Sequence, residues 1–405
     1  MRACLESIPE DINRVFVAYS GGLDSSVLLH LLLSEKRKYQ IVPWHINHGL
    51  VDSAKQMEQF CLQQAADNGL EIRVHQLDLD DTGSNIEAVA RRLRYRLFER
   101  HSGRGDCILT AHHADDQAET FLLNALRASG AAGLRGIARQ RYLGETLLLR
   151  PLLGYSRAQL EAYAAEHEIA WFNDPSNQNL RFDRNYLRHE ILPLLKNRWP
   201  NFNMALSTCS EIQSETQAML VEVAQQDYAT LSIQRPGAET RLDLPGLLAL
   251  SDGRRKNLVR YWIDLAGQAP LPQARLQELM LQLQAGIDAS PEIAMPNYSI
   301  RIYDRQLFLV NASRLQDCSG EFDFGLKPEI EIPALELCLT RGQLFERLGI
   351  EDQAQSLMLK FRREGESNPD SHRLKRLFQQ HRVPPWQRSQ TAQVYLDGRL
   401  EGLLL

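Results

Sequence analysis

Short and long hydrophobic patterns alternate along the first 150 residues of this 405-residue chain. The short patterns are continuous apolar runs, which are typical of buried parallel strands, and the long patterns repeat an apolar residue every three or four positions, as helices do. The apolar runs cover residues 15–19, 41–46, 72–77 and 107–111, and the helical patterns cover residues 25–35, 52–68, 85–101 and 115–127. This alternation predicts an α/β fold in which helices cover a parallel sheet.

Polar residues gather at the ends of the first and fourth predicted strands. In an open parallel sheet, ligands bind beyond the carboxyl ends of the strands, where the strand order reverses. A strand order of 3-2-1-4 would place the loops after the first and fourth strands on either side of that crevice. The polar segments at residues 20–26 and 112–120 follow these two strands, so the sequence predicts that they share one site.

Beyond residue 150 the pattern becomes mostly helical and indicates further domains. A long helix is predicted over residues 203–226. Two more helices, a strand-like meander, a polar linker and a basic helix are predicted at 254–266, 272–285, 298–310, 316–326 and 372–381. We therefore expect a catalytic domain, a mostly helical middle domain and a small α+β domain, covering residues 1–205, 206–315 and 325–405.

The segment SGGLDS at residues 20–25 connects the first predicted strand to the first predicted helix. The start of a helix carries about half a positive elementary charge and several unpaired N–H groups, which stabilise a bound anion. Gly21 and Gly22 have no Cβ atom, so backbone N–H groups can approach that anion and φ can be positive. The loop predicts phosphate binding; the alternative is that Asp24 and Ser25 only cap the helix.

Asp24 distinguishes this loop from the phosphate-binding loop of kinases and GTPases. That loop has the pattern GxxxxGK[ST], whereas residues 20–26 contain no lysine. A carboxylate repels a neighbouring phosphate unless a cation lies between them. Asp24 therefore predicts a bound Mg²⁺, which proteins usually hold through one or two carboxylates together with substrate phosphates.

Two acidic residues and a histidine are predicted to lie together after the fourth strand. On a helix that begins near Asp115, Asp116 and Glu119 are three positions apart and face the same way, and His112 lies just before this helix. Carboxylates and an imidazole in a crevice can hold an ammonium group and take a proton from it. The alternative is a helix whose acidic first turn only complements the helix dipole.

Arginines form clusters whose function the spacing leaves open. Glu87, Arg91 and Arg94 share one helix face, and an exposed stripe of this kind contributes only about 0.2–0.5 kcal/mol per pair. Alternatively, Arg91 or Arg94 reaches a phosphate group, because guanidinium donors match the charge that develops there in phosphoryl chemistry. Arg184 and Arg188 are equally compatible with a role as backbone clamps and with phosphate contacts.

Composition narrows the class of protein. The formal net charge is −5, so the chain as a whole is not a polycation, although local arginine clusters can bind nucleic acid. Neither a membrane-spanning run nor a signal peptide is evident, so we expect a cytoplasmic protein. The six cysteines lie far apart and form no CxxC pair, which indicates reduced thiols rather than a disulfide framework or a metal site.

Several motifs in this order resemble those of one enzyme family. The loop at residues 20–25 is similar to the pyrophosphate-binding loop of the PP-loop ATP pyrophosphatases. The further motifs are HGL at 48–50, ExxARxxRY at 87–95, HHADDQAET at 112–120, RPLL at 150–153 and DPSN…RNxxR at 174–188. The ordered set resembles the tRNA(Ile)-lysidine synthases, and residues 374–388 are similar to the end domain of the longer members of that family.

The resemblance implies a Rossmann-like PP-loop domain and a reaction in two steps. ATP adenylates O2 of the wobble cytidine in an isoleucine tRNA with the anticodon CAU, and pyrophosphate is released. The ε-amine of free L-lysine then attacks C2, and AMP leaves. We expect no obligate protein partner.

The resemblance also assigns residues. It implies that ATP is bound by Ser20, Gly21, Gly22, Leu23, Asp24 and Ser25. Asp24 would hold the Mg²⁺, and Arg91 would lie near the phosphates. Lysine would be recognised by His112, Asp116 and Glu119, with Asp24, Arg91 and Asp116 forming the catalytic set. We expect the tRNA to contact Arg184, Arg188, Lys375, Arg376 and Arg388.

Two other functions remain open at this point. A tRNA 2-thiolation ATPase of the same superfamily would need paired cysteines, and the nearest candidates, Cys61 and Cys107, are isolated in the sequence. A nucleotide-binding RNA adaptor without catalysis would bind ATP but release no pyrophosphate. The presence of Asp24, Arg91 and the acidic cluster argues against such a loss of catalysis.

Overall fold

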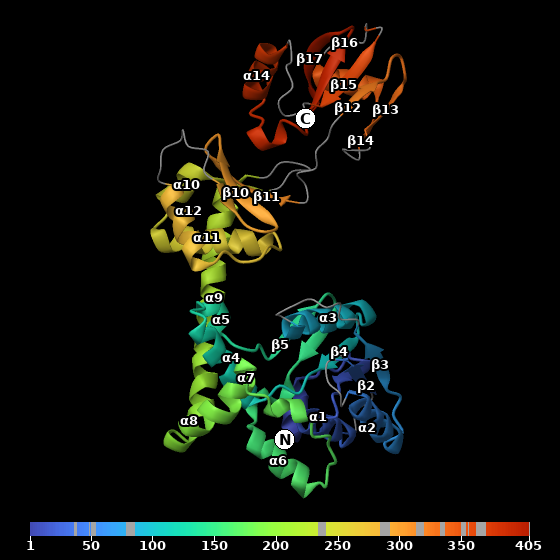
Figure 1. Cartoon of the computed structure of the whole chain (residues 1–405), viewed down its shortest axis with the longest axis vertical. Coiled ribbons are helices and arrows are strands. Elements are labelled where there is room, and N and C mark those ends of the chain that lie inside the picture. The colour runs from blue at the N-terminus through green and yellow to red at the C-terminus, as the bar shows by residue number, and fades with distance from the viewer. Residues whose placement is uncertain are drawn as a thin grey trace. The chain divides into compact units, whose positions relative to one another are not determined.

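The computed structural model describes most of the chain. The residues outside it are 36–38, 48, 50–53, 78–85, 234–239, 284–291, 313–319, 333–336, 350–353, 355, 362–369 and 405, and the side chains of 2–3, 86–88, 176–177, 332 and 337 are outside it as well. The chain forms two compact units, Met1–Met219 and Leu220–Leu405 (Figure 1). Each unit is built around its own sheets and buried apolar residues.

The first unit contains a six-stranded sheet in the order β3-β2-β1-β4-β6-β5. Its strands are β1 (Arg14–Ala18), β2 (Gln40–Asn47), β3 (Arg73–Gln76), β4 (Asp106–Leu109), β5 (Gln140–Leu143) and β6 (Thr146–Leu149). All neighbours pair in parallel except β5, which runs antiparallel to β6 at the edge. The predicted order 3-2-1-4 is confirmed.

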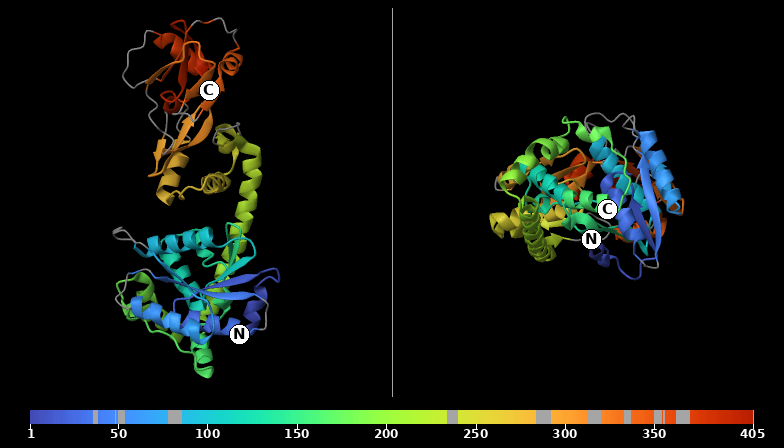
Figure 2. Two further views of the ribbon diagram at one scale, coloured as in Figure 1. Left: turned by 90° about the vertical axis from the view of Figure 1, so that its right-hand side faces the viewer. Right: turned by 90° about the horizontal axis from the view of Figure 1, so that it is seen from below.

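Helices cover both faces of this sheet (Figure 2). They include α1 (Leu23–Leu33) and α2 (Ala54–Asp67) on one face and α3 (Ile86–His101) on the other, while α4 (Ala114–Leu126) follows β4. Successive residues of β1 point to opposite faces, so Val15 packs in the core with α1, whereas Phe16 packs with Trp44 and with Phe98 of α3. Both faces are buried, which explains why the strands read as continuous apolar runs.

The remainder of the first unit is helical. It contains α5 (Ala131–Leu134), α6 (Arg157–Glu166), α7 (Asp183–Tyr186), a π-helical turn (Leu187–Ile191) and α8 (Leu192–Arg198). Short 3-10 turns occur at Arg2–Ser7, Pro151–Gly154 and Pro175–Gln178. The long helix α9 (Phe202–Leu231) confirms the helix predicted over 203–226 and runs from the first unit into the second.

The second unit begins with a mixed region. Three helices, α10 (Leu244–Ala249), α11 (Asp252–Leu265) and α12 (Gln273–Gln282), pack on a sheet in the order β7-β8-β11-β10-β9. Its strands are β7 (Ser232–Ile233), β8 (Arg241–Asp243), β9 (Glu292–Ala294), β10 (Tyr298–Tyr303) and β11 (Gln306–Asn311). The predicted meander is the pair β10 and β11, and the three short strands add to it.

The end of the chain forms a four-stranded antiparallel sheet in the order β12-β15-β16-β17 and a separate pair, β13 and β14. The elements are β12 (Gly320–Asp323), β13 (Glu329–Ile332), β14 (Leu337–Thr340), α13 (Arg341–Leu348), β15 (Leu357–Phe361), α14 (Ser371–Gln380), a 3-10 turn (Pro385–Gln387), β16 (Ala392–Leu396) and β17 (Arg399–Leu404). Helix α14 confirms the predicted basic helix.

The linker predicted over residues 316–326 is wrong for part of its length. Residues 316–319 lie outside the described part, but Gly320–Asp323 forms strand β12 and pairs with β15. The polar residues of this stretch alternate with Phe322, which packs against the core and lies 6.0 Å from the ring of Phe361. A four-residue strand with one half-buried apolar side chain carries too weak a hydrophobic pattern to be separated from a linker by sequence alone.

None of the helices in the described ranges combines the length and the hydropathy that a membrane span requires.

The loop between β1 and α1 is packed closely from behind by α2. Gly21 has a φ of +79°, and a Cβ atom there would lie 2.9 Å from the Sγ atom of Cys61 and 3.1 Å from the ring of Phe60. Gly22 has a φ of −73°, and the nearest atom to its Cβ position is Ser20 Oγ at 3.5 Å. Only the first of these two glycines is therefore required by both conformation and space.

We expect Gly21→Ala to lower the free energy of unfolding by about 1–3 kcal/mol, because it adds left-handed strain and a steric clash. The control Gly22→Ala should cost less than about 1 kcal/mol, the loss typical of a poorer N-cap. Denaturant unfolding of both variants measures the difference. Equal losses would contradict the strain argument.

Candidate active site

The loop after β1 presents an uncapped helix start. Gly22 is the N-cap of α1, and no side chain caps the helix. Ser20 Oγ lies 3.1 Å from Ser25 Oγ, which itself donates to the carbonyl of Gly22 at 3.0 Å, and the N–H of Phe172 donates to the carbonyl of Gly21 at 2.8 Å. The alternative that Asp24 or Ser25 caps α1 is therefore wrong. The first-turn N–H groups remain available for an anion.

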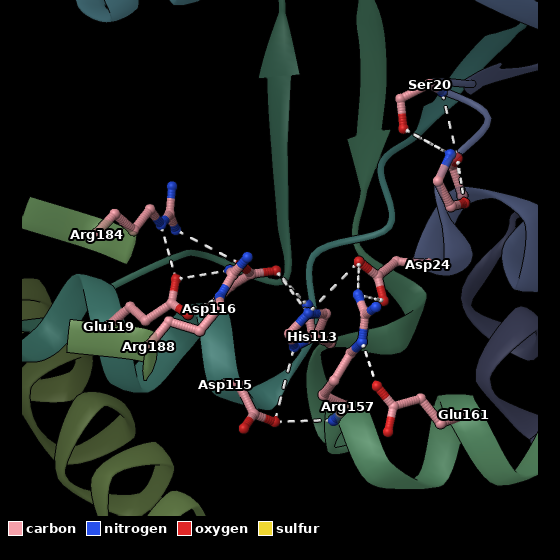
Figure 3. A network of polar contacts seen from close by, with 12 residues as sticks. Ser20, Asp24, His113, Asp115, Asp116, Glu119, Arg157, Glu161, Arg184 and Arg188 are labelled. Carbon is pink, nitrogen blue, oxygen red and sulfur yellow. Dashed lines mark hydrogen bonds and ion pairs between the residues drawn. The ribbon is translucent and has the colours of Figure 1, made fainter. Parts of the chain in front are cut away.

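Asp24 points away from the loop toward an arginine that sequence reasoning missed (Figure 3). Arg157, in the first turn of α6, places Nη1 2.9 Å from both carboxylate oxygens of Asp24 and Nε 3.0 Å from Glu161. The second oxygen of Asp24 also lies 3.6 Å from Nε2 of His113. A cation thus already neutralises Asp24, at the place where the sequence predicts Mg²⁺.

His113 lies at the centre of the polar network (Figure 3). Its Nε2 atom is 3.5 Å from Asp116 and 3.6 Å from Asp24, its Nδ1 atom is 3.8 Å from Asp115, and its side chain is only 2% exposed. Burial alone would lower the pKa of His113, but the carboxylates of Asp116 and Asp24 outweigh burial and raise it. His113 is part of the HHADDQAET motif, but the sequence resemblance assigned the recognition of lysine to its neighbour His112.

His112 has a different environment. Its Nδ1 atom lies 2.9 Å from the hydroxyl of Thr110. Burial lowers the pKa of His112 to about 3, and the nearby Arg150 and Arg94 act in the same direction, against the opposing effect of Asp116. The ring of His112 is therefore neutral at physiological pH. Its charged neighbours include arginines as well as the predicted carboxylate of Asp116.

Asp116 and Glu119 do lie together, as predicted, and both are bound by Arg184 and Arg188. Glu119 is fully buried and receives Arg188 at 2.6 and 3.0 Å and Arg184 at 2.8 Å. Asp116 is held less closely, with Arg188 at 3.2 Å and Arg184 at 3.8 Å. The two arginines considered for tRNA thus neutralise the predicted lysine site in this structure.

The surrounding cations lower the pKa of Asp116. Burial raises it, but His113, Arg184, His112 and Arg188 outweigh burial and hold it at about 2. Asp116 is therefore a carboxylate at any physiological pH. Such a group holds a cation firmly but is a weak proton acceptor.

Asp115 has a structural role that the sequence did not reveal. It accepts a hydrogen bond from Lys196 of α8 and another, at 2.8 Å, from the backbone N–H of Arg157. These contacts outweigh burial and lower the pKa of Asp115. Asp115 thereby ties α6 and α8 to the start of α4, and no local pattern in the sequence could have identified partners so far along the chain.

Arg91 and Arg94 lie on α3 with their guanidinium groups 5.3 and 5.8 Å from the centre of the Tyr95 ring. The third member of the predicted stripe, Glu87, has its side chain outside the described part of the chain. Arg91, Arg94 and Arg150 act on the pKa of His112, so they lie beside the end of β4. The HGL motif falls largely outside the described part, because His48 and Leu50 are not described.

The three basic residues predicted at the C-terminal end lie in the second unit. Lys375 and Arg376 are exposed on α14. Arg388 is half-buried, donates from Nε to the carbonyl of Val383 at 3.2 Å and lies 5.5 Å from the centre of the Phe378 ring. Lys375 and Arg376 are therefore free to meet a ligand from solvent, whereas Arg388 also supports its own domain.

Asp24, the carboxylate predicted to hold Mg²⁺, lies beside His113, and the carboxylate of Asp116 lies near the same ring nitrogen. Both carboxylates lie within 3.6 Å of the same ring nitrogen of His113. Within the described ranges, no set of three or more His, Cys, Asp or Glu residues forms a metal cage. Such a sparse donor set suits Mg²⁺, which keeps water ligands and is completed by substrate phosphates, and does not suit zinc.

Cys61 and Cys107 are not reactive thiols. Both are fully buried in the apolar core, and burial raises the pKa of each to about 12. A thiolate is the nucleophile in sulfur chemistry, so neither residue is prepared for it.

The parallel sheet, the uncapped glycine loop after β1 and the carboxylates after β4 define an ATP-utilising PP-loop enzyme. Family models agree, since the PP-loop domain matches residues 2–195, the TilS substrate binding domain residues 242–308 and the TilS substrate C-terminal domain residues 357–401. The tRNA(Ile)-lysidine synthase of Serratia proteamaculans is 38% identical over 400 residues, which cover 95% of this chain and 89% of that protein. The chain belongs to the tRNA(Ile)-lysidine synthase family.

Further relatives extend the comparison. The tRNA(Ile)-lysidine synthase of Alkalilimnicola ehrlichii is 38% identical over 386 residues, covering 92% of this chain and 85% of that protein. That of Coxiella burnetii is 34% identical over 396 residues, covering 95% and 87%. Among solved structures, the U34-tRNA thiolase NcsA from Methanococcus maripaludis aligns with a TM-score of 0.45 and 16% identity over 53% of this chain and 77% of its own.

We expect the two adjacent histidines to titrate very differently. His113 should titrate above its ordinary pKa of about 6.5, and His112 should stay neutral down to a pH near its pKa of about 3. Histidine NMR signals followed against pH measure both. Because folding raises the pKa of His113, its charge stabilises the fold below pH of about 6.5, and this contribution is lost as the pH rises through the raised value.

The carboxylate beside His113 provides the control for this titration. Asp116→Asn should lower the pKa of His113, whereas Asp183→Asn, which removes an exposed partner of Arg127, should leave it unchanged. A His113 pKa that is the same in both variants would contradict the electrostatic explanation.

Proposed function

We propose that this protein ligates free L-lysine to C2 of the wobble cytidine in a tRNA(Ile) with the anticodon CAU, forming lysidine. In the first step O2 of the cytidine attacks the α-phosphorus of ATP and pyrophosphate leaves. In the second step the ε-amine attacks C2, the C–O bond to AMP breaks, and the attacking nitrogen loses its protons. Because tRNA, ATP and free lysine meet in the cytoplasm, we propose that the protein acts there.

One observation carries this proposal. Asp24, from the phosphate loop, and Asp116, from the acidic pocket, approach the same nitrogen of His113 at 3.6 and 3.5 Å. An ATP bound at the loop and an amine bound at the pocket would therefore be neighbours. This proximity is what a reaction needs in which adenylation and amine attack occur at one nucleotide.

ATP would be bound mainly by main-chain donors. The uncapped first turn of α1 and the hydroxyls of Ser20 and Ser25 would bind its phosphates. Arg91 would approach the phosphate at which charge develops. A Mg²⁺ ion between Asp24 and the phosphates would neutralise their charge. Asp24 could accept it by loosening its contact with Arg157, a side chain that is 37% exposed.

Lysine would bind through its ammonium group at Asp116. Of the two predicted carboxylates, Asp116 has the longer contacts with the arginines, so an ammonium group can replace a guanidinium there at lower cost. Glu119 would keep Arg184 and Arg188 in place at contacts of 2.6 to 3.0 Å. Neutral His112 could donate or accept one further hydrogen bond.

The amine must lose a proton before it attacks. Asp116, with a pKa of about 2, would hold the ammonium group rather than deprotonate it. His113 lies 3.5 Å from Asp116 and has a raised pKa. The neutral form of His113 is therefore a stronger base than the carboxylate of Asp116. We therefore assign the orienting role to Asp116 and the role of proton acceptor to His113.

The tRNA would also contact the second unit through the exposed Lys375 and Arg376, with Arg388 supporting them. The alternative function, 2-thiolation of tRNA, is not favoured, since the curated relatives over nearly the whole chain are lysidine synthases and Cys61 and Cys107 are buried.

The function is tested by incubating the protein with ATP, labelled lysine and one of two tRNAs. We expect lysine incorporation into tRNA(Ile) with the anticodon CAU, with one AMP and one pyrophosphate released per lysine, and none into elongator tRNA(Met). ATP turnover without transfer of lysine to RNA would refute the proposal.

We expect Asp116→Asn to raise the KM for lysine about tenfold or more, since a charge-assisted hydrogen bond contributes about 1.5–3 kcal/mol. The KM for ATP should change by less than about threefold. Glu161→Gln, which alters an exposed partner of Arg157, is the control and should leave the KM for lysine unchanged. Equal effects of Asp116→Asn on both substrates would remove Asp116 from the lysine site.

A further inference from the structure

Four arginines surround one tyrosine in the first unit. The guanidinium carbon of Arg141 lies 4.0 Å from the centre of the Tyr95 ring, and those of Arg91 and Arg94 lie 5.3 and 5.8 Å away. Arg150 donates from Nη2 to the Tyr95 hydroxyl at 3.4 Å. These residues come from α3, from the edge strand β5 and from the end of β6. We call Tyr95, Arg94, Arg141 and Arg150 the Tyr95 cluster.

The Tyr95 cluster has no carboxylate partner among the described residues. Its arginines contact the tyrosine and, for Arg150, the backbone carbonyl of Ala138. By contrast, Arg157, Arg184 and Arg188 each pair with carboxylates in the same unit. Among the described residues, the arginines around Tyr95 thus differ from these three paired arginines.

Packing these cations together is unfavourable without an anion. Burial lowers the pKa of Arg94, and the charges of Arg91, Arg184 and Arg150 lower it further. Arg150 is only 4% exposed, and its Nε atom is buried without a hydrogen-bond partner. Arg150 is buried and Arg94 half-buried, unlike ordinary solvated surface arginines, and with the exposed Arg141 beside them they match a site for a phosphate group.

The sheet places Arg150 and Arg141 of the Tyr95 cluster two and three strands away from β1, whose loop would hold ATP. Strand β4 lies between β1, which carries the loop, and β6, which leads to Arg150, while Arg141 lies on β5 beyond β6. Neighbouring strands are about 4.8 Å apart, so β1 and β6 are separated by about 10 Å. His112, at the end of β4, lies between the loop and the cluster and senses Arg150 and Arg94.

We propose that the Tyr95 cluster binds a backbone phosphate of the RNA strand that enters the active site. The proposal rests on the proposed function, which requires an RNA nucleotide beside the ATP. Arg141 is exposed on the edge strand, so an RNA strand could extend past it on both sides of the bound phosphate. The triphosphate of ATP has no such continuation. The planar guanidinium groups suit phosphate oxygens, and the tyrosine ring holds them in place.

The test uses the full-length protein and a tRNA(Ile) ligated from two pieces, so that single anticodon-loop phosphates can be replaced by uncharged methylphosphonates. Arg141→Gln is the main variant because Arg141 is exposed and its loss should not disturb folding. Arg94→Gln is a second variant. Arg96→Gln is the matched control, an exposed arginine on the same helix that is not among the four around Tyr95.

We expect Arg141→Gln to weaken tRNA binding about tenfold and to reduce the slope of log Kd against log salt by about 0.7–0.9. ATP affinity, measured without RNA, should stay the same. One methylphosphonate should weaken binding to the wild type and to Arg96→Gln but have no further effect on Arg141→Gln, because both changes remove the same contact.

Two outcomes would overturn the proposal. Weaker ATP binding with unchanged tRNA binding would assign the Tyr95 cluster to the nucleotide phosphates. No change in either affinity for Arg141→Gln and Arg94→Gln would make the cluster a packing feature of α3 and β5. A wild-type protein that binds tRNA with this phosphate dependence but incorporates no lysine would refute the proposed function and leave the phosphate site standing.

Discussion

The buried carboxylate of Glu119 determines how the active-site half of the first unit is assembled. A fully buried charge is tolerated only when it is paired and hydrogen-bonded, and Glu119 receives three short contacts from Arg184 and Arg188. These arginines belong to α7 and the π-helical turn that follows it, so the pairing docks that segment onto α4. Asp115 fastens α6 and α8 to the same helix. The carboxylates of α4 thus hold the fold together at the place where the proposed chemistry would occur.

Charge is arranged in opposite ways on the two sides of the end of β4. Toward the phosphate loop, carboxylates and cations alternate, with His113 between Asp24 and Asp116. Toward β6, cations gather around Tyr95 without carboxylate partners in the described part of the chain. Two neighbouring histidines differ accordingly: the carboxylates of Asp116 and Asp24 raise the pKa of His113 despite its burial, whereas burial, aided by Arg150 and Arg94, lowers the pKa of His112 to about 3. Under the proposed function, the first side would take the cationic amine and the second an anionic phosphate of the RNA.

Local patterns in the sequence predicted four of the six strands of the first sheet and missed the short strands β5 and β6. The apolar runs gave the four central strands, and the rule that ligands lie beyond strand ends brought residues 20–26 and 112–120 together. Partners far along the chain could not be predicted. Arg157 meets Asp24 across 133 positions, and Lys196 meets Asp115 across 81. Spacing identifies residues on one helix face, but nothing in it reveals which distant side chain will neutralise a charge. For the same reason the sequence did not reveal that His113 lies among the carboxylates of Asp24, Asp115 and Asp116.

The packing behind Gly21 has a consequence for ligand affinity. The side chains of Cys61 and Phe60 and the backbone of Phe172 hold the glycine loop in its curved form. The entropic cost of ordering the loop is therefore part of the free energy of folding and does not oppose the binding of ATP. Because the loop is preorganised, a larger part of the interaction energy with the phosphates contributes to the binding affinity. Substitutions in α2 that only loosen the packing behind the loop should accordingly weaken nucleotide binding, although they change no atom in contact with the nucleotide.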